Sequence, residues 1–359
     1  LKGGVPQNPL LFLNVWGASQ ALMAWLAFFN FYLVVKVFNT LDYQGFNFKV
    51  SKMNQVWVTG DAVVDLIPES ETSLLKCPGG APANVAVAIA RLSGKSAFFG
   101  RVGDDPFGRF MKSTLDHEGV CTEFLVKDPE QRTSTVVVDL DDQGERSFTF
   151  MVKPSADQFM SVEDIPNFKQ GDWLHVCSIS LANEPSRSST FEAIKRAKAA
   201  GGFISFDPNL RDEVWQDQSE IQAVVMKAVA MADVVKFSEE ELLFLTDSTS
   251  MAQGLQQIAA LNIALVLVTQ GAKGVWRVFE SQTELITGQV ASPIDTTGAG
   301  DAFVGGLLAC LSQHEDWKNH PVVSSAIQWA NGCGALATTQ KGAMTALPTQ
   351  TELLQFIGQ

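Results

Sequence analysis

The chain lacks the excess of positive charge that nucleic-acid-binding proteins need. Its 359 residues include 26 lysines and arginines against 39 aspartates and glutamates, so the formal net charge is -13 at pH 7. Neutralising a phosphate backbone takes a broad basic surface. We therefore expect no nucleic-acid partner.

Cysteine and histidine are also scarce. The five cysteines contain no C-x-x-C pair, and the four histidines have no metal-ligand spacing. A chain of this length does not need disulfides to hold its core. We therefore expect reduced thiols, a cytoplasmic location, and no histidine-based metal site.

Several common catalytic and nucleotide-binding motifs are missing. The tripeptide Gly94-Lys95-Ser96 ends like a Walker A loop, but Ile89 stands where the leading glycine would be. There is no G-x-G-x-x-G, G-x-S-x-G or H-E-x-x-H motif. The sequence thus excludes a P-loop, a dinucleotide fingerprint and a nucleophile elbow.

Tyrosine occurs only at Tyr32 and Tyr43, so the sequence from Met53 onward has none. Residues 1–52 also carry four lysines and one acid, and they include an apolar run from Leu10 to Phe38 that is long enough to span a membrane. No A-x-A-like site closes this run, which argues against a secretory signal. We interpret residues 1–52 as an apolar, disordered extension outside the domain, added artificially or by a misplaced start. A genuine membrane anchor is the alternative; on the first interpretation no membrane contact is expected.

From Met53 onward, short apolar runs alternate with helix-like segments such as 186–200 and 217–232. Strands separated by helices favour parallel pairing through βαβ crossovers, which predicts a doubly wound α/β fold. Two further β-rich runs, 133–140 and 146–152, flank a turn cluster and predict a hairpin standing apart from the main sheet. The predicted main strands are 56–60, 96–103, 173–179, 202–208, 234–238 and 264–271.

The segment Asp295-Thr296-Thr297-Gly298-Ala299-Gly300-Asp301 is the strongest functional signal. Small residues that lead directly into a helix leave its first amides uncovered, and these amides with the helix dipole form an anion site. Asp301 could simply cap the helix. The flexible glycines before it favour a base that takes a proton from a hydroxyl while nearby amides stabilise a transferring phosphoryl group.

A second glycine-rich segment is Cys77-Pro78-Gly79-Gly80-Ala81-Pro82-Ala83-Asn84, which precedes the helix-like run VAVAIARL. Paired glycines allow a hydroxylated ligand to lie against the backbone, and Asn84 offers both a donor and an acceptor. Glycine and proline before a helix are also ordinary punctuation. Taken alone, this segment leaves both interpretations open.

Together, GGAPANVAVAIARL (79–92) and DTTGAGDAFVGGLL (295–308) resemble the two signatures of the ribokinase/PfkB family of sugar kinases. The resemblance covers Met53 to Gln359, and segments such as GDAVVDLIPE and SFDPNLR are most similar to bacterial members that phosphorylate fructose. Members acting on aminoimidazole riboside are close relatives. The resemblance implies a ribokinase-like, mainly parallel sheet flanked by helices, with a small β-sheet lid at about 65–80 and 132–153.

The resemblance also assigns roles to residues. It implies that Asp301 is the base that deprotonates the sugar's primary hydroxyl, with the amides of Gly298, Ala299 and Gly300 as an anion hole. Asp65, at the end of the strand-like run VWVTGDAVVD, would grip sugar hydroxyls, whereas Asp61 is a less secure candidate that could be a turn or cap residue. The other implied sugar-binding residues are Gly79, Gly80, Asn84, Glu145 of the lid, and Arg211.

For the nucleotide, the resemblance implies that Ser238 and Glu241 occupy a position where the family commonly has Asn-x-x-Glu. Glu241 would organise the Mg2+ that accompanies ATP, through water; a solvated helix start is the alternative. Thr269, Gly271 and Gly274 would line the nucleotide together with Gly298 and Gly300. A monovalent cation, K+, would be held mostly by backbone oxygens at Asp295, Thr297, Ala337, Gln340, Gly342 and Ala346.

The expected function is therefore transfer of the γ-phosphoryl group of ATP to the primary hydroxyl of D-fructose, with a homodimer through the lid edges as a possible assembly. The same chemistry on aminoimidazole riboside or ribose is the nearest alternative. Two alternatives belong to other classes of protein. A non-catalytic sugar-binding protein should have lost Asp301 or the glycines next to it, and both are present. A membrane-anchored sensor would require the run from Leu10 to Phe38.

Overall fold

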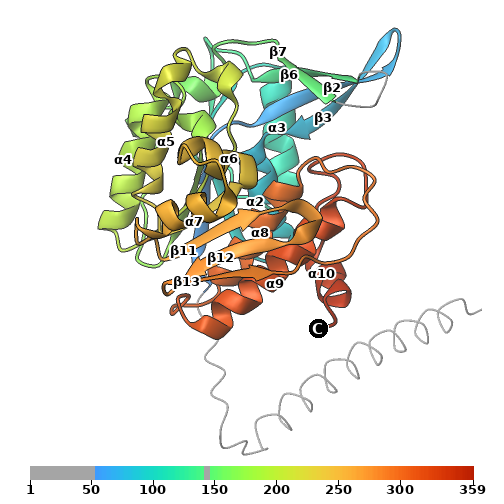
Figure 1. Cartoon of the computed structure of the whole chain (residues 1–359). Coiled ribbons are helices and arrows are strands. Elements are labelled where there is room, and N and C mark those ends of the chain that lie inside the picture. Colours follow the sequence, from blue (N-terminus) through green and yellow to red (C-terminus); the bar gives the residue numbers. More distant parts are fainter. Residues whose placement is uncertain (1–52, 141–145) are drawn as a thin grey trace, which may run out of the picture. The chain divides into compact units, whose positions relative to one another are not determined.

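The computed structural model describes residues 53–140 and 146–359 (Figure 1). The predictions made for residues 1–52 and for Glu145 lie outside these residues. Within the described part of the chain, no helix combines the length and the apolar character that crossing a membrane requires. All five cysteines lie in the described part and are free.

A nine-stranded sheet forms the centre of the described body, in the order β13-β12-β11-β10-β9-β8-β1-β4-β5. All neighbours pair in parallel except β11 with β12 and β12 with β13, so the predicted mainly parallel sheet is confirmed. The strands are β1 (Gln55–Thr59), β4 (Lys95–Gly103), β5 (Leu125–Asp128), β8 (Trp173–Cys177), β9 (Phe203–Asp207), β10 (Val234–Ser238), β11 (Leu265–Thr269), β12 (Val275–Phe279) and β13 (Gln282–Ile286).

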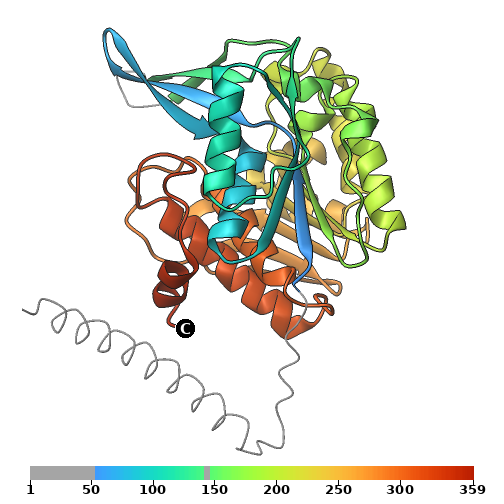
Figure 2. The same ribbon diagram turned by 180° about the vertical axis from the view of Figure 1, so that it is seen from behind.

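Helices cover both faces of this sheet (Figures 1 and 2). One apolar cluster joins the sheet to α2 (Ala81–Arg91), α3 (Pro106–His117), α8 (Ala299–Leu311) and α9 (His320–Ala337), with α10 (Gln350–Phe356) against α9. A second cluster, on the other face, contains side chains of α4 (Ser186–Ala199), α5 (Ile221–Val229), α6 (Glu239–Leu245) and α7 (Met251–Ala259).

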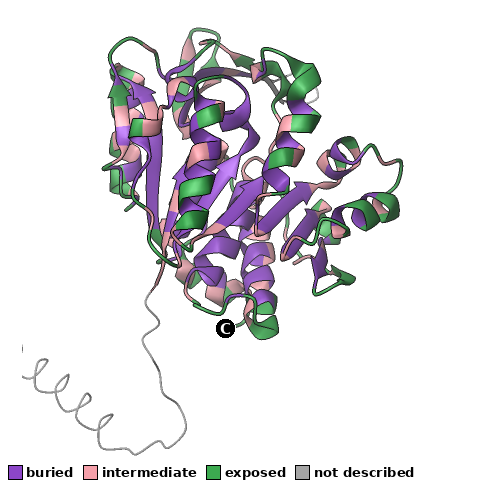
Figure 3. Ribbon diagram, turned by 90° about the vertical axis from the view of Figure 1, so that its left-hand side faces the viewer, coloured by how far each residue is buried: buried purple, intermediate pink, exposed green. Residues whose placement is uncertain are grey.

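The central strands are apolar because they are buried on both faces, as Figure 3 shows. In β10, Val235 and Phe237 join one cluster while Val234 joins the other. Lys236 interrupts this apolar strand although the residue is only 8% exposed. A charge in such a place needs a buried partner, and that partner belongs to the site described below.

A separate four-stranded sheet has the order β3-β2-β6-β7. It consists of β2 (Val63–Ser70), β3 (Ser73–Gly79), β6 (Thr135–Leu140) and β7 (Arg146–Phe150). Strands β6 and β7 pair antiparallel, which confirms the predicted hairpin apart from the main sheet. We call this small sheet the lid.

Three predictions differ in part from the structure. The predicted strand 56–60 corresponds to β1, but the longer strand-like run VWVTGDAVVD is two strands, because Gly60 turns the chain with a φ of 140° before β2 begins at Val63. The strand predicted over 173–179 ends at Cys177, where a 3-10 turn (Ser178–Leu181) follows. The helix predicted over 217–232 begins as an α-helix only at Ile221.

Candidate functional site

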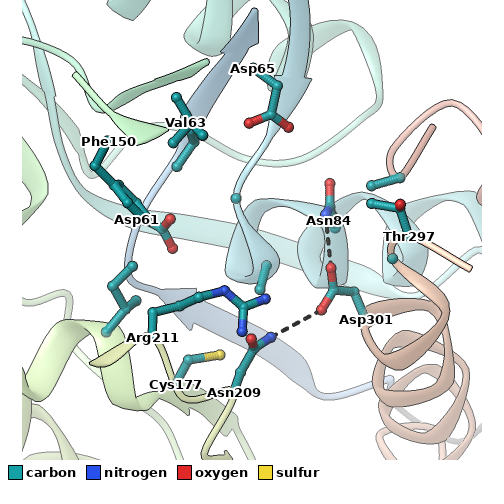
Figure 4. A pocket seen from close by; sticks show the side chains of 16 residues that line it. Asp61, Val63, Asp65, Asn84, Phe150, Cys177, Asn209, Arg211, Thr297 and Asp301 are labelled. Atoms are coloured by element: carbon teal, nitrogen blue, oxygen red, sulfur yellow. Dashed lines mark hydrogen bonds between the residues drawn. The ribbon is translucent and has the colours of Figure 1, made fainter. Parts of the chain in front are cut away.

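Two pockets meet at the start of α8. The first, which we call the acceptor pocket, has a volume of about 720 Å³ and lies between the lid and the carboxyl ends of the main strands (Figure 4). Open α/β sheets bind ligands at this edge, because the loops that follow parallel strands gather there. The pocket is lined by Asp61, Val63, Asp65, Gly80, Ala81, Asn84, Val136, Phe150, Cys177, Ile179, Asn209, Arg211, Thr297, Gly298, Asp301 and Ala343.

Asp301 projects into the acceptor pocket from the first turn of α8 (Figure 4). The residue is only 7% exposed, and its two carboxyl oxygens accept hydrogen bonds from Asn84 Nδ2 at 2.8 Å and Asn209 Nδ2 at 3.4 Å. Burial raises the pKa of Asp301 to about 6, against the hydrogen bond from Asn84 and the charges of Lys236 and Arg211. The carboxylate is thus a stronger base than an ordinary aspartate and is still ionised at neutral pH.

The amides beside Asp301 are presented by a left-handed glycine. Gly298 caps α8 with a φ of 76°, and a Cβ at this position would lie 2.8 Å from the Ala343 Cβ. Both the backbone angle and the space therefore require glycine. The amide of Ala299 donates to the Thr296 carbonyl at 3.2 Å, so this predicted anion-hole amide would have to leave that bond to bind a phosphate oxygen.

Asp61 and Asp65 face the lid side of the acceptor pocket (Figure 4). Asp61 is 5% exposed, and its Oδ1 has no hydrogen-bond partner in the described part of the chain. Burial, with a further contribution from Asp157, raises the pKa of Asp61 to about 8. At neutral pH the Asp61 carboxyl is therefore protonated, so that it can donate a hydrogen bond to a ligand oxygen.

The predicted glycines Gly79 and Gly80 allow Asp61 and Asp65 to lie close to the start of α2. Gly80 has a φ of 95°, and a Cβ on it would lie 2.6 Å from the Asp61 carbonyl oxygen. A Cβ on Gly79 would collide with the Asp65 carboxyl. Asn84, in the first turn of α2, is 3% exposed, and its Oδ1 has no partner among the described residues. A ligand hydroxyl would satisfy that oxygen.

Arg211 lies across the middle of the acceptor pocket. Figure 4 shows its guanidinium group between Asp61 and Asp301, and its charge lowers the pKa of both carboxyls. The residue is exposed, and its Nη1 donates to the Leu210 carbonyl at 2.7 Å. Its remaining donors face the space where an anionic group would meet the acceptor.

The second pocket, of about 990 Å³, lies on the other side of the α8 start and is more apolar in character. It brings together the predicted Thr269, Gly271 and Gly274 with Gly300. Because Gly298 and Asp301 line the first pocket while Ala299 and Gly300 line the second, a group bound in one can reach a group bound in the other at this turn.

Ser238 and Glu241 do not line either pocket. They form a capping box on α6: Ser238 Oγ accepts from the Glu241 amide at 3.1 Å, and Glu241 Oε2 accepts from the Ser238 amide at 2.8 Å. Glu241 Oε1 accepts from the Leu210 amide at 3.0 Å. Ser238 and Glu241 therefore have the geometry of a helix start, and neither side chain faces the pocket that holds the other predicted nucleotide-binding residues.

The described residues contain no cluster of three or more acidic, histidine or cysteine side chains that could hold a metal ion. A hard cation such as Mg2+ would therefore take most of its oxygen ligands from phosphates and water. Backbone amides donate to both carboxyl oxygens of Glu241, which agrees with a contact to the metal through water.

The segments predicted to bind a monovalent cation lie against each other. Asp295 Oδ1 accepts from the amide of Thr297 at 3.0 Å and from its hydroxyl at 2.7 Å, and Asp295 Oδ2 accepts from the Gly342 amide at 2.8 Å. The Thr338 carbonyl accepts from the Ile294 amide at 2.7 Å, so the end of α9 joins the same loop. These contacts bring the predicted residues Asp295, Thr297 and Gly342 to the same place.

Sequence reasoning missed the lysine below the anion site. Lys236 Nζ contacts the two carboxyl oxygens of Asp207 at 3.1 and 3.2 Å, and a Cβ on Gly300 would lie 3.4 Å from the same nitrogen. Burial works to lower the pKa of Lys236, but the charges of Asp207, Glu241 and Asp301 outweigh it and raise that pKa. The signal in the sequence was a lysine within the apolar run VVKFS.

Asn209 was missed as well, although it lies only two residues after the end of β9. Its contact with Asp301 depends on β9 and α8 meeting in space, which no local pattern encodes.

Fold and site together define a kinase of small hydroxylated molecules, with an acceptor pocket and a nucleotide-sized pocket that share one helix start. The chain belongs to the pfkB family of carbohydrate kinases, whose family model matches residues 53–350. This confirms the family predicted from the two glycine-rich segments.

Among its relatives, the Vibrio alginolyticus fructokinase is 96% identical over 307 residues, covering 86% of this chain and 100% of the relative. The Salmonella typhimurium aminoimidazole riboside kinase is 41% identical, covering 85% of this chain and 95% of the relative. A crystal structure of Vibrio cholerae O395 fructokinase bound to fructose, ADP and a calcium ion has a TM-score of 0.82 at 66% identity, covering 85% of this chain and 99% of the other.

Proposed function

We propose that this chain transfers the γ-phosphoryl group of ATP to the primary hydroxyl of D-fructose, giving fructose 6-phosphate and ADP. The observation that carries the proposal is the shared start of α8, where Asp301 faces the acceptor pocket and Gly300 faces the larger pocket. The fructokinase relatives support fructose as the acceptor.

In the proposed reaction Asp301 accepts the proton of the primary hydroxyl as the hydroxyl oxygen attacks phosphorus. The bond between phosphorus and the bridging oxygen of ADP breaks, and that oxygen keeps the electron pair. The α8 dipole and the amides of its first turn stabilise the charge on the phosphoryl oxygens, and Arg211 adds a nearby cation. Most of the acceleration would come from positioning and electrostatics.

Metal ions complete the proposed site. Mg2+, when bound with ATP, neutralises phosphate charge, and Glu241 would hold it through water. K+ would sit beside the anion hole on the loops joined by Asp295 and Gly342. Dimerisation through the lid and a cytoplasmic location stay predictions.

A substrate panel measured by ADP release tests the proposal. We expect turnover of fructose above that of ribose and glucose, and a higher rate when K+ replaces tetramethylammonium at equal ionic strength. Absence of fructose turnover with ATP and Mg2+ would contradict the proposed function. Equal rates in K+ and tetramethylammonium would contradict the cation site alone.

The rate should also follow pH with a bell-shaped profile. Asp301 must be ionised to accept a proton, so kcat/KM is expected to rise as pH increases through about 6, the value to which burial raises its pKa. Asp61 donates only while protonated, so kcat/KM should fall above about 8, the pKa that burial gives it. Initial rates between pH 4.5 and 9.5 check both limbs. An acid limb at the ordinary aspartate value, or an alkaline limb that persists in Asp61→Asn, would contradict these assignments.

A further inference from the structure

Asn209 contacts the proposed base from the side opposite Asn84. Asn209 Nδ2 donates to Asp301 Oδ1 at 3.4 Å, and Asn84 Nδ2 donates to Asp301 Oδ2 at 2.8 Å. Figure 4 shows the Asp301 carboxyl group between the two asparagines. The two amides come from different parts of the fold, because Asn84 lies in the first turn of α2 and Asn209 lies after β9. Each carboxyl oxygen of the proposed base therefore has an amide donor of its own.

The backbone of Asn209 adopts a conformation that few residues with a side chain accept. Its φ is 39°, in the left-handed region, where asparagine is tolerated better than most residues. Residues in sparsely populated conformations cluster at functional sites, and they persist only where the surrounding structure fixes them. The position of Asn209 therefore depends on contacts around the turn.

Hydrogen bonds on both sides of Asn209 supply those contacts. The Pro208 carbonyl accepts from the Ser178 amide at 3.1 Å. The Leu210 amide donates to Glu241 Oε1 at 3.0 Å. Ser178 begins the 3-10 turn after β8, and Glu241 lies in the first turn of α6. Two neighbouring elements thus fix the turn from which the Asn209 side chain reaches α8.

Two amide donors restrict how the Asp301 carboxylate can turn. Each carboxylate oxygen has about two lone pairs, so one donor on each oxygen leaves further lone pairs for a hydroxyl in the acceptor pocket. A general base must lie within hydrogen-bond reach of the proton that it takes, and its hydrogen bonds often tighten when substrate binds. A misplacement of about 1 Å costs about 10²-fold in rate. The orientation of this carboxylate is therefore worth a large part of its effect as a base.

We propose that Asn209 is a positioning residue, whose carboxamide holds the Asp301 carboxylate in the orientation that accepts the proton of the primary hydroxyl. The inference rests on the proposed function, because that function assigns Asp301 as the base. Asn209 itself takes no proton and forms no bond to phosphorus. Its loss should therefore slow the chemical step and leave binding of the sugar nearly unchanged.

Asn209→Gly tests the inference in the full chain. Glycine adopts a left-handed φ without strain, so this variant removes the carboxamide and keeps the turn. We expect kcat for fructose to fall about tenfold, as for a slightly misplaced base, while KM stays within about twofold of wild type. A higher KM with an unchanged kcat would mean that Asn209 binds the sugar directly, and it would overturn the inference.

A double variant separates an effect through Asp301 from an independent one. If Asn209 acts through the carboxylate, adding Asn209→Gly to Asp301→Ala should change kcat by less than about twofold. A further loss of about tenfold in the double variant would overturn the inference and leave the proposed function intact. Wild-type kcat in Asp301→Ala alone would refute the proposed base itself, so the two failures are distinguishable.

Asn262→Gly is the matched control. Asn262 also has a left-handed φ, of 54°, but it is exposed and lines neither of the two pockets at the start of α8. Its kcat and KM for fructose should stay within about twofold of wild type. An equal fall of kcat in the two glycine variants would trace the loss to the turn and not to contact with Asp301, which would overturn the inference.

Asn209→Ala covers the case in which the glycine variant does not fold. Alanine removes the same carboxamide and leaves the unfolded chain less freedom than glycine does. The same fall in kcat of about tenfold is expected, again with KM nearly unchanged. Wild-type kcat in this variant would overturn the inference.

Discussion

Replacing Asp301 with alanine is expected to lower kcat for fructose by about 10²–10⁴ while the protein stays folded, as for loss of a positioned general base. The carboxylate is buried, faces the acceptor pocket and has a pKa raised to about 6, so its removal takes away the base proposed for the primary hydroxyl. The KM for fructose should change less than kcat, because the other sugar-facing groups remain. Steady-state ADP release and a thermal melt give the two quantities.

Asp172→Asn is the matched control for that prediction. Asp172 is as buried as Asp301, at 6% against 7% exposed, but it lines neither of the two pockets that meet at the start of α8. Its kcat for fructose should stay within about twofold of wild type. Wild-type turnover by Asp301→Ala, or an equal loss in Asp172→Asn, would refute the role of Asp301 as base.

Replacing Lys236 with methionine should lower the free energy of unfolding more than the other proposed substitutions do. Lys236 Nζ lies 3.1 and 3.2 Å from the two Asp207 oxygens, and both residues are buried. Removing one partner leaves the other as an uncompensated buried charge, which costs about 3–5 kcal/mol of unfolding free energy. Urea denaturation of wild type and variant measures the difference.

A double variant separates this structural effect from catalysis. Lys236→Met with Asp207→Asn removes both charges, so most of the stability should return. Activity should stay low, because the ammonium group next to Gly300 is still missing. Full recovery of kcat together with stability would show that Lys236 serves only the fold.

The two glycine-rich segments could be recognised from sequence because their requirements are local. Gly298 needs a left-handed φ, and Asp301 follows it by three residues at the start of the same helix. The six strands predicted from apolar runs all lie in the main sheet, since parallel strands buried on both faces are apolar throughout.

Several other strands could not be predicted in this way. β13 is mostly exposed, so neither a continuous apolar run nor an alternating pattern marks it. β2 and β3 likewise expose much of their surface in the lid. Their pairing partners, not their own composition, make these segments strands.

The predicted role of Glu241 shows a different limit of prediction from sequence: one spacing can belong to two kinds of structure. The spacing from Ser238 to Glu241 is shared by a nucleotide motif and by a capping box, and only the structure shows the two hydrogen bonds that form the box. Similarly, nothing near Asn209 in the sequence indicates its contact with Asp301, because the two residues are 92 positions apart.

The sequence by itself determined the α/β class and the sugar kinase family, and it predicted Asp301 as the base and the glycines before it as part of an anion site. These follow from short patterns, since helix starts and backbone angles depend on neighbouring residues. Only the tertiary structure decided that Lys236 and Asp207 lie next to Gly300 and that Asn209 contacts Asp301. Such features arise where the carboxyl ends of parallel strands bring together residues that are far apart along the chain.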